Sequence, residues 1–164
     1  MEALSRTAAR LRPWLVRGKR LPNLLFFTDP KRTPDPERVA ERLPAGAAVV
    51  FRAFGAPDAA ARGRRLREIT RRRGLTLLVG ADAALALEVK ADGLHLPERL
   101  AADAPGLRAM HPGWLITLAA HDEAAARLGA SVGVDALVVS PIFPSRSPSA
   151  AGSAAWPQEP WDPC

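Results

Sequence analysis

The sequence predicts an α/β fold built on a parallel sheet, and three observations predict it. Short apolar runs of strand length recur along the chain, and stretches with helix-capping residues or helical spacing separate them. The runs do not alternate with polar residues, which is typical of parallel strands covered on both faces. Two architectures fit this order, a doubly wound open sheet and part of a (β/α)8 barrel. The turn after the first run, TDPKRTPD, lacks the glycines of a dinucleotide-binding turn, which weighs against the doubly wound sheet.

The predicted elements follow one another in a regular order. The six predicted strands are residues 23–28, 47–51, 75–79, 93–96, 114–119 and 136–139, and the predicted helices are residues 35–43, 57–74, 82–90 and 121–129. Asp35 and Pro36 are typical of a helix N-cap and of the first helical position. Gly74 and Gly129 are natural helix stops.

A pattern around one aspartate occurs twice, in KADGLHLP (90–97) and in GVDALVVSP (133–141). In both segments a helix ends, the aspartate follows, and a strand begins. We therefore interpret them as one supersecondary unit used twice, with Asp92 and Asp135 as turn-forming residues.

The composition indicates a globular chain. Its 164 residues are enough for one domain with its own core. It contains no apolar run of the roughly 20 residues that a membrane span needs, and no evident secretory signal. The single cysteine is Cys164, so neither a disulfide framework nor a cysteine-based zinc cluster is expected. We predict a cytoplasmic protein without a membrane partner.

The net charge of +6 is distributed unevenly. Residues 1–20 carry six basic side chains against Glu2, and residues 62–73 carry seven arginines against Glu68. We predict a basic N-terminal helix over residues 1–21, although a presequence or a nucleic-acid-binding arm has the same composition. The arginines of the second segment predict a solvated outer helix face. No aromatic side chains interleave with them, so a nucleic-acid partner is not expected.

Six segments at the predicted strands carry a resemblance to a known family: FFTDP (26–30), VVFRAFG (49–55), LLVGADAALAL (77–87), KADGLHLPE (90–98), LITLAAHDEAAA (115–126) and VDALVVSPIFPSRSPSAAG (134–152). In this order they resemble the thiamine phosphate synthase/TenI family over about residues 22–152, and a Pro- and Trp-rich tail, residues 153–164, follows. The resemblance implies an incomplete (β/α)8 TIM-barrel type fold of about six βα units. It also implies the chemistry of thiamine biosynthesis. Family synthases join a pyrimidine pyrophosphate to a thiazole phosphate with Mg²⁺, and family TenI proteins are thiazole tautomerases.

The resemblance places anion contacts at the end of the second predicted strand. The family motif Gln-x-Arg-x-Lys corresponds to Val50, Arg52 and Phe54, so the arginine alone is kept. We predict that Arg52 either binds an anionic group of the substrate or forms an ion pair with Asp29 or Glu98.

The resemblance also implies magnesium-binding acids after the third and fourth strands. Ala81 and Leu100 stand at those positions, Asp82 comes one residue late, and Glu98 is the acid left nearby. Because Mg²⁺ prefers carboxylate and phosphate oxygens, we expect no metal ligands and no cofactor.

Further family positions predict the remaining site residues. His121 matches the histidine that serves the tautomerases as acid and base, but its position is also typical of a helix N-cap. His95 lies at a strand end, where a structural hydrogen bond competes with substrate binding. Ser140, Ser145 and Ser147 follow the last strand and predict a phosphate-binding loop.

Taken together, these positions predict a truncated thiamine phosphate synthase/TenI-like protein with impaired synthase activity. It would at most bind a small phosphorylated ligand, either a thiazole phosphate or a pyrophosphate-type compound. The alternatives are an active synthase or tautomerase with an altered site, and a non-catalytic interaction module. Because an open six-stranded sheet leaves its outer strands unpaired, we also predict a homo-oligomer that covers them.

Overall fold

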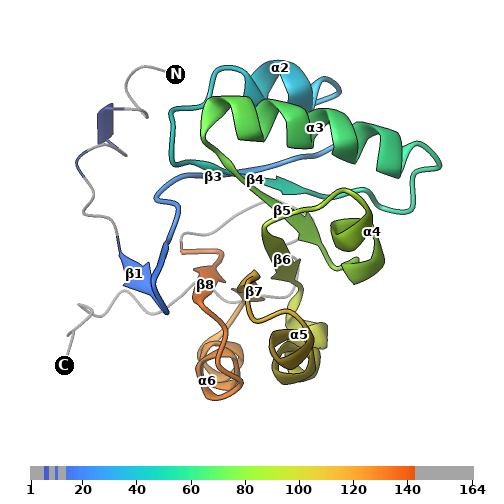
Figure 1. Ribbon diagram of the computed structural model, residues 1–164. Helices are drawn as coiled ribbons and strands as arrows, with labels where there is room; N and C mark the ends of the chain where they lie inside the picture. The colour runs from blue at the N-terminus through green and yellow to red at the C-terminus, as the bar shows by residue number, and fades with distance from the viewer. Residues whose placement is uncertain (1–5, 8–9, 11–13, 143–164) are drawn as a thin grey trace.

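The computed structural model describes residues 6–7, 10 and 14–142. Within them, six strands form one parallel sheet in chain order: β3 (Leu25–Phe27), β4 (Ala48–Phe51), β5 (Thr76–Gly80), β6 (Gly93–Leu96), β7 (Leu115–Ala120) and β8 (Ala136–Val139). Figure 1 shows that the sheet is curved and that the helices lie on its convex side. The six predicted strands and the parallel α/β fold are therefore confirmed.

The helices connect successive strands, as the sequence predicts. They are α2 (Pro36–Ala40), α3 (Ala59–Arg73), α4 (Ala83–Glu88), the 3₁₀ helix η1 (Glu98–Asp103), α5 (Ala104–Met110) and α6 (Glu123–Ser131). Asp35 caps α2 by accepting a hydrogen bond from Arg38 N at 3.0 Å. Gly74 ends α3 in the left-handed conformation, with φ 64°. Both predicted capping residues are thus confirmed.

The prediction that Gly129 stops the last helix is wrong, because α6 continues to Ser131. Gly129 lies inside the helix where it crosses the sheet. A Cβ atom there would come within 2.5 Å of Leu137 Cδ2 and 2.8 Å of Leu118 Cδ2. The residue is a glycine because of close helix–sheet packing, which local sequence does not reveal.

The side chains of the strands alternate between two cores. The larger core lies between the sheet and the helices and includes Val49, Leu77, Leu94 and Ile116. The smaller core lies on the opposite, concave face, where Val50, Leu78 and Leu115 pack with Leu21, Leu25 and Phe27. Because successive residues of a strand point to opposite faces, the same strands fill both cores.

The predicted N-terminal helix over residues 1–21 is wrong for its last part. Residues 15–20 form a hairpin of two short antiparallel strands, β1 (Leu15–Val16) and β2 (Lys19–Arg20). Lys19 Nζ donates to the carbonyls of Pro112 at 3.1 Å and Trp114 at 2.7 Å. The hairpin is held by these tertiary contacts at the start of β7, which the basic composition of the segment does not encode. Burial lowers the pKa of Lys19, and the charge of Arg108 adds to this effect.

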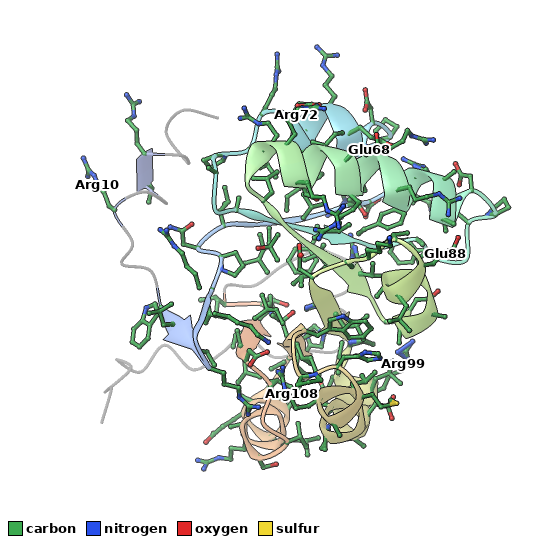
Figure 2. The ribbon with its side chains drawn as sticks, viewed as in Figure 1. Arg10, Glu68, Arg72, Glu88, Arg99 and Arg108 are labelled. Carbon is green, nitrogen blue, oxygen red and sulfur yellow. The ribbon has the colours of Figure 1, made fainter. Side chains whose placement is uncertain are left out.

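The twice-used unit is a repeated ion-pair arrangement, which we call the aspartate clamp. Asp92, before β6, accepts from Leu77 N of β5 at 2.8 Å and binds Arg67 of α3 through two bonds of 2.7 and 2.8 Å. Asp135, before β8, accepts from Ile116 N of β7 at 2.8 Å and binds Arg108 of α5. In Figure 2, Arg108 lies between α5 and α6 below the sheet. Each aspartate therefore joins two strands and a helix, which is more than the turn-forming role that we predict.

The described sheet ends in β3 and β8, which pair on one side only within the residues that the structure covers. Their side chains are half-buried, whereas those of β4 and β6 are fully buried. The homo-oligomer that would cover these edges stays a prediction. None of the helices in the described part of the chain is long and apolar enough to cross a membrane.

The two aspartate clamps differ in burial, and this predicts different costs of removing them. The Asp135 side chain is 0% exposed and that of Asp92 is 36% exposed. We expect Asp135→Ala to lower the free energy of unfolding by about 3–5 kcal/mol, because it leaves the Arg108 charge without a carboxylate and the Ile116 N–H buried without its acceptor. Asp92→Ala should cost about 1–3 kcal/mol, since the Asp92 carboxylate is partly exposed and water can take its place beside Arg67. Urea unfolding of both variants measures the difference, and equal losses would contradict the argument.

Candidate functional site

A cavity of about 800 Å³ opens at the carboxyl ends of the strands. It is lined by Phe27, Arg52, Ala53, Phe54, Gly55, Gly80, Ala81, Asp82, Ala83, His95, Pro97, Arg99, Ala119, His121, Val138 and Ser140. These residues come from the ends of the strands and from the loops that follow them. This is the end of a (β/α) barrel at which active sites form.

Arg52 follows β4 and is held in place from several sides. Its Nε donates to the Thr28 carbonyl at 2.7 Å, and its Nη2 lies 3.5 Å from a carboxylate oxygen of Asp29. The guanidinium lies 5.8 Å from the ring centre of Phe27 and 5.2 Å from that of Phe54, which are cation–π distances. Of the two predicted ion pairs, the one with Asp29 is therefore formed. The guanidinium still has N–H donors that these contacts do not use.

Asp29 is itself fixed as an anion by the backbone. Its carboxylate accepts from Arg32 N at 3.1 Å and Lys31 N at 2.9 Å. These two hydrogen bonds lower the pKa of Asp29, with a further contribution from the charge of Arg52. The carboxylate therefore stays charged and keeps Arg52 oriented.

Phe54 stands at the rim of the cavity in an unusual backbone conformation. Its φ is 50°, in the left-handed region that an aromatic residue rarely adopts, and Gly55 beside it has a φ of 74°. The Phe54 side chain is 68% exposed and covers Arg52. The aromatic ring thus takes the place that the family resemblance gives to a lysine. Val50, at the position of the family glutamine, is fully buried in the smaller core instead of facing the cavity.

His121 reaches the cavity from the end of β7. Its Nδ1 forms a 2.8 Å hydrogen bond with the Ser140 carbonyl oxygen. A carbonyl oxygen can only accept, so Nδ1 carries the hydrogen and the neutral ring has its free lone pair on Nε2. The helix N-cap is the next residue, Asp122, which accepts from Ala125 N at 2.8 Å. His121 is therefore free of the capping role that its position suggested.

His95 forms the buried wall of the cavity. Its Nδ1 is 2.9 Å from Thr117 Oγ1, and its ring meets that of Phe27 edge-on, with centres 5.0 Å apart. Burial lowers the pKa of His95 from 6.5 to about 4, and the charges of Arg52 and His121 contribute to the same shift. The structural hydrogen bond expected for His95 is present, and the ring also lines the cavity.

Only part of the predicted phosphate-binding loop falls in the described residues. Ser140 lines the cavity and its carbonyl holds His121. Ser145, Ser147 and the tail of residues 153–164 lie outside the described residues.

The two family metal positions carry no acids in this chain. Ala81 has a φ of 63° and donates its N–H to the His95 carbonyl at 3.0 Å. Asp82 lines the cavity, but its carboxylate accepts from Leu85 N at 2.8 Å and caps α4. No group of three His, Cys, Asp or Glu side chains within the described ranges could hold a metal ion. The residues at the two family positions therefore offer Mg²⁺ no carboxylate oxygen and do not fit the family's metal site, and the absence of a cofactor stays a prediction.

Arg99 lines the cavity although the local sequence did not indicate it as a site residue. It lies in the first turn of η1 and lines the cavity together with Arg52. The available signal was its place between Glu98 and Leu100, in the segment where the resemblance puts acids. Its orientation toward the cavity depends on the fold and cannot be read from the local sequence.

A comparison with known families identifies the chain. A family model described as thiamine monophosphate synthase matches residues 24–158. The chain belongs to the thiamine monophosphate synthase family. This agrees with the resemblance carried by the segments at the strand ends, and it connects the chain with thiamine biosynthesis.

Individual members of the thiamine monophosphate synthase family show the extent of the likeness. A thiamine-phosphate synthase of Pelotomaculum thermopropionicum is 37% identical over 86 residues, which cover 51% of this chain and 38% of that protein. The thiamine biosynthesis bifunctional protein ThiED of Geobacter sulfurreducens is 36% identical over 85 residues, covering 52% of this chain and 17% of the relative. The matches thus span well under two thirds of either relative.

A solved structure confirms the fold. The thiamine phosphate pyrophosphorylase from Pyrococcus furiosus superposes with a TM-score of 0.63 and 28% sequence identity, over 74% of this chain and 61% of that one. The curved six-stranded sheet with its outer helices therefore corresponds to the TIM-barrel-like fold of this family, as predicted.

The low pKa of His95 predicts a pH dependence of stability. Between pH 6.5 and about 4 the unfolded chain binds a proton at His95 that the folded chain does not. The free energy of unfolding should therefore fall as the pH is lowered through this range, by on the order of 3 kcal/mol from this residue.

Urea unfolding at about pH 7 and about pH 4.5 tests this contribution. The control is His95→Asn, which keeps a nitrogen near the position of Nδ1 but does not titrate. The wild-type protein should lose more stability than this variant on acidification, and parallel losses would show that His95 does not contribute.

Proposed function

We propose that the cavity binds a small phosphorylated ligand, a thiazole phosphate or a pyrophosphate-type compound, and that efficient magnesium-dependent synthase activity is impaired. The observation that supports this proposal is the presence of Arg52 and His121 on one cavity at the strand ends. The other walls are mostly apolar or small side chains. Such a site suits a ring that carries one anionic group.

Arg52 is the proposed anion contact. A guanidinium presents a planar set of donors that matches phosphate oxygens, and it keeps its charge at all physiological pH values. The contacts with Thr28 and Asp29 fix its direction before a ligand arrives. A prearranged contact avoids part of the entropy cost of binding.

His121 is the proposed acid and base. With its hydrogen on Nδ1, the Nε2 atom can take a proton from a bound ligand and return one elsewhere. Aromatisation of a thiazole by tautomerisation needs one proton removed and one returned, with no bond formed between two substrates. This observation favours a tautomerase as the second candidate function.

The synthase reaction makes greater electrostatic demands than the site meets. A departing pyrophosphate develops negative charge that must be stabilised in the transition state. The resemblance implies that Mg²⁺ and a lysine provide the compensating positive charge in the family. The corresponding positions here are Ala81, Leu100 and Phe54, which carry no charge. We therefore propose that this chain retains ligand binding and proton transfer, whereas its ability to join the two synthase substrates is impaired.

An interaction module that uses the arginines of α3 is less well supported. Arg64 pairs with Glu88 at 2.7 Å, Arg65 with Glu37 at 3.3 Å, and Arg67 and Arg72 with Asp92 and Glu41. Figure 2 shows Arg72 and Glu68 on the outer surface of α3. Pairing of this kind reduces the positive field available to a polyanion.

A cytoplasmic location of the protein stays a prediction.

Binding of thiazole phosphate tests the anion contact. We expect Arg52→Ala to weaken the affinity at least about tenfold, because a charge-assisted hydrogen bond to phosphate is lost. Isothermal titration calorimetry measures the affinity. The matched control is Arg64→Ala, which removes an exposed ion pair on α3 away from the cavity. Equal affinities in wild type and Arg52→Ala would reject Arg52 as the contact.

Turnover tests the role of His121. We expect His121→Ala to slow isomerisation of the thiazole phosphate by about 10²-fold or more while leaving its binding intact, as for loss of a general base. Nuclear magnetic resonance of the substrate ring follows the reaction. In parallel, incubation with both synthase substrates and Mg²⁺ should give no thiamine phosphate in a thiochrome fluorescence assay. A thiochrome signal that Arg52→Ala removes would contradict impaired synthase activity.

A further inference from the structure

The cavity contains a second arginine that the fold does not require. Arg99 lines the cavity from the first turn of η1, and its side chain is exposed. In Figure 2 it lies between α4 and α5 in the view shown. Within residues 14–142, eight ion pairs join arginines to carboxylates, and none includes Arg99.

Stability gives no reason for a cation at this position. The first turn of a helical segment carries partial positive charge from its unpaired N–H groups, so basic residues there are mildly unfavourable. Glu98 beside it is the residue that suits this turn. Arg99 therefore adds a charge at an unfavourable place without a carboxylate among the described residues to compensate it.

The cavity offers this charge little internal neutralisation. Asp82 is the one acid among the residues that line it, and its carboxylate already accepts from Leu85 N at 2.8 Å. The arginines that line the cavity are Arg52 and Arg99, and the rings of His95 and His121 line it as well. Asp29 already pairs with Arg52, so Arg99 is the arginine of this cavity without an ion pair among the described residues, and no group of three acids, histidines or cysteines there could hold a divalent cation.

We propose that Arg99 is the second anion-binding residue of the cavity and that, with Arg52, it binds phosphate oxygens directly and without a metal ion. This inference rests on the proposed function, since it assigns the charge that neutralises the same phosphorylated ligand. A guanidinium can donate two parallel hydrogen bonds to a phosphate group. Two guanidiniums from different walls supply the positive charge that a bound cation would otherwise contribute.

Titration of the full chain with inorganic pyrophosphate tests the inference. In the presence of EDTA we expect measurable binding, and added Mg²⁺ should not strengthen it. Arg99→Gln should weaken the affinity about tenfold or more, in line with the loss of hydrogen bonds to a charged group. The matched control is Arg71→Gln, because Arg71 is likewise exposed and lies in none of the described ion pairs, on the far helix α3. Thermal unfolding of both variants checks that they are folded.

The outcomes separate this inference from the proposed function. Binding that requires Mg²⁺ would overturn the direct arginine contact and leave the phosphate site in place. Loss of affinity in Arg52→Ala together with unchanged affinity in Arg99→Gln would do the same. Absence of pyrophosphate binding under both conditions, together with absence of thiazole phosphate binding, would overturn both proposals.

Discussion

The arrangement of the sheet depends on the aspartate clamp. In each copy, one carboxylate accepts the N–H of the neighbouring strand and binds an arginine from the helix that precedes that strand. The aspartate backbone adds to this, because Asp92 N donates to Leu77 O and Asp135 N donates to Ile116 O, each at 2.8 Å. Strand register, helix position and turn are therefore set by the same residue. A one-residue slip would turn every side chain to the other face, so the clamp also decides that His95 faces the cavity.

The cavity follows from the sizes of the inward-facing residues. Large side chains fill the middle of the concave face, whereas Gly80 and Ala119 leave space at the strand ends. Gly93 shows how close the strands must come, because a Cβ atom there would lie 1.9 Å from the Leu115 carbonyl oxygen. The second copy of the unit has Ala136 at the equivalent place, where β8 has no further strand among the described residues. Packing thus explains why the residue after the aspartate is a glycine in the first copy and can be an alanine in the second.

The sequence predicted the features that depend on local or periodic signals. Six strands, the cap at Asp35 and the stop at Gly74 can be read directly from apolar runs and from capping chemistry. Helix α5 was not predicted because Pro105 and Gly106 are residues that usually break a helix. Proline is nevertheless acceptable in the first turn, where it stands here. The β1–β2 hairpin could not be predicted, since it depends on carbonyls about ninety residues away in the chain, to which Lys19 donates. In the site, the family resemblance pointed to Arg52 and His121, but only the fold places Arg99 on the same cavity.

The two arginines of the cavity differ in how many contacts hold them, and under the proposed function this difference would bear on ligand selection. Arg52 is fixed by Thr28, Asp29 and two aromatic rings before any ligand binds. Arg99 is exposed, so holding it in one conformation costs about 1.5–2 kcal/mol of side-chain entropy. A ligand with one singly charged oxygen gains enough from Arg52 alone and offers little to offset that cost. A phosphate or pyrophosphate has several charged oxygens and can engage both guanidiniums at once. Under the proposed function, Arg52 would orient the ligand, and the exposed Arg99 would favour the more highly charged group.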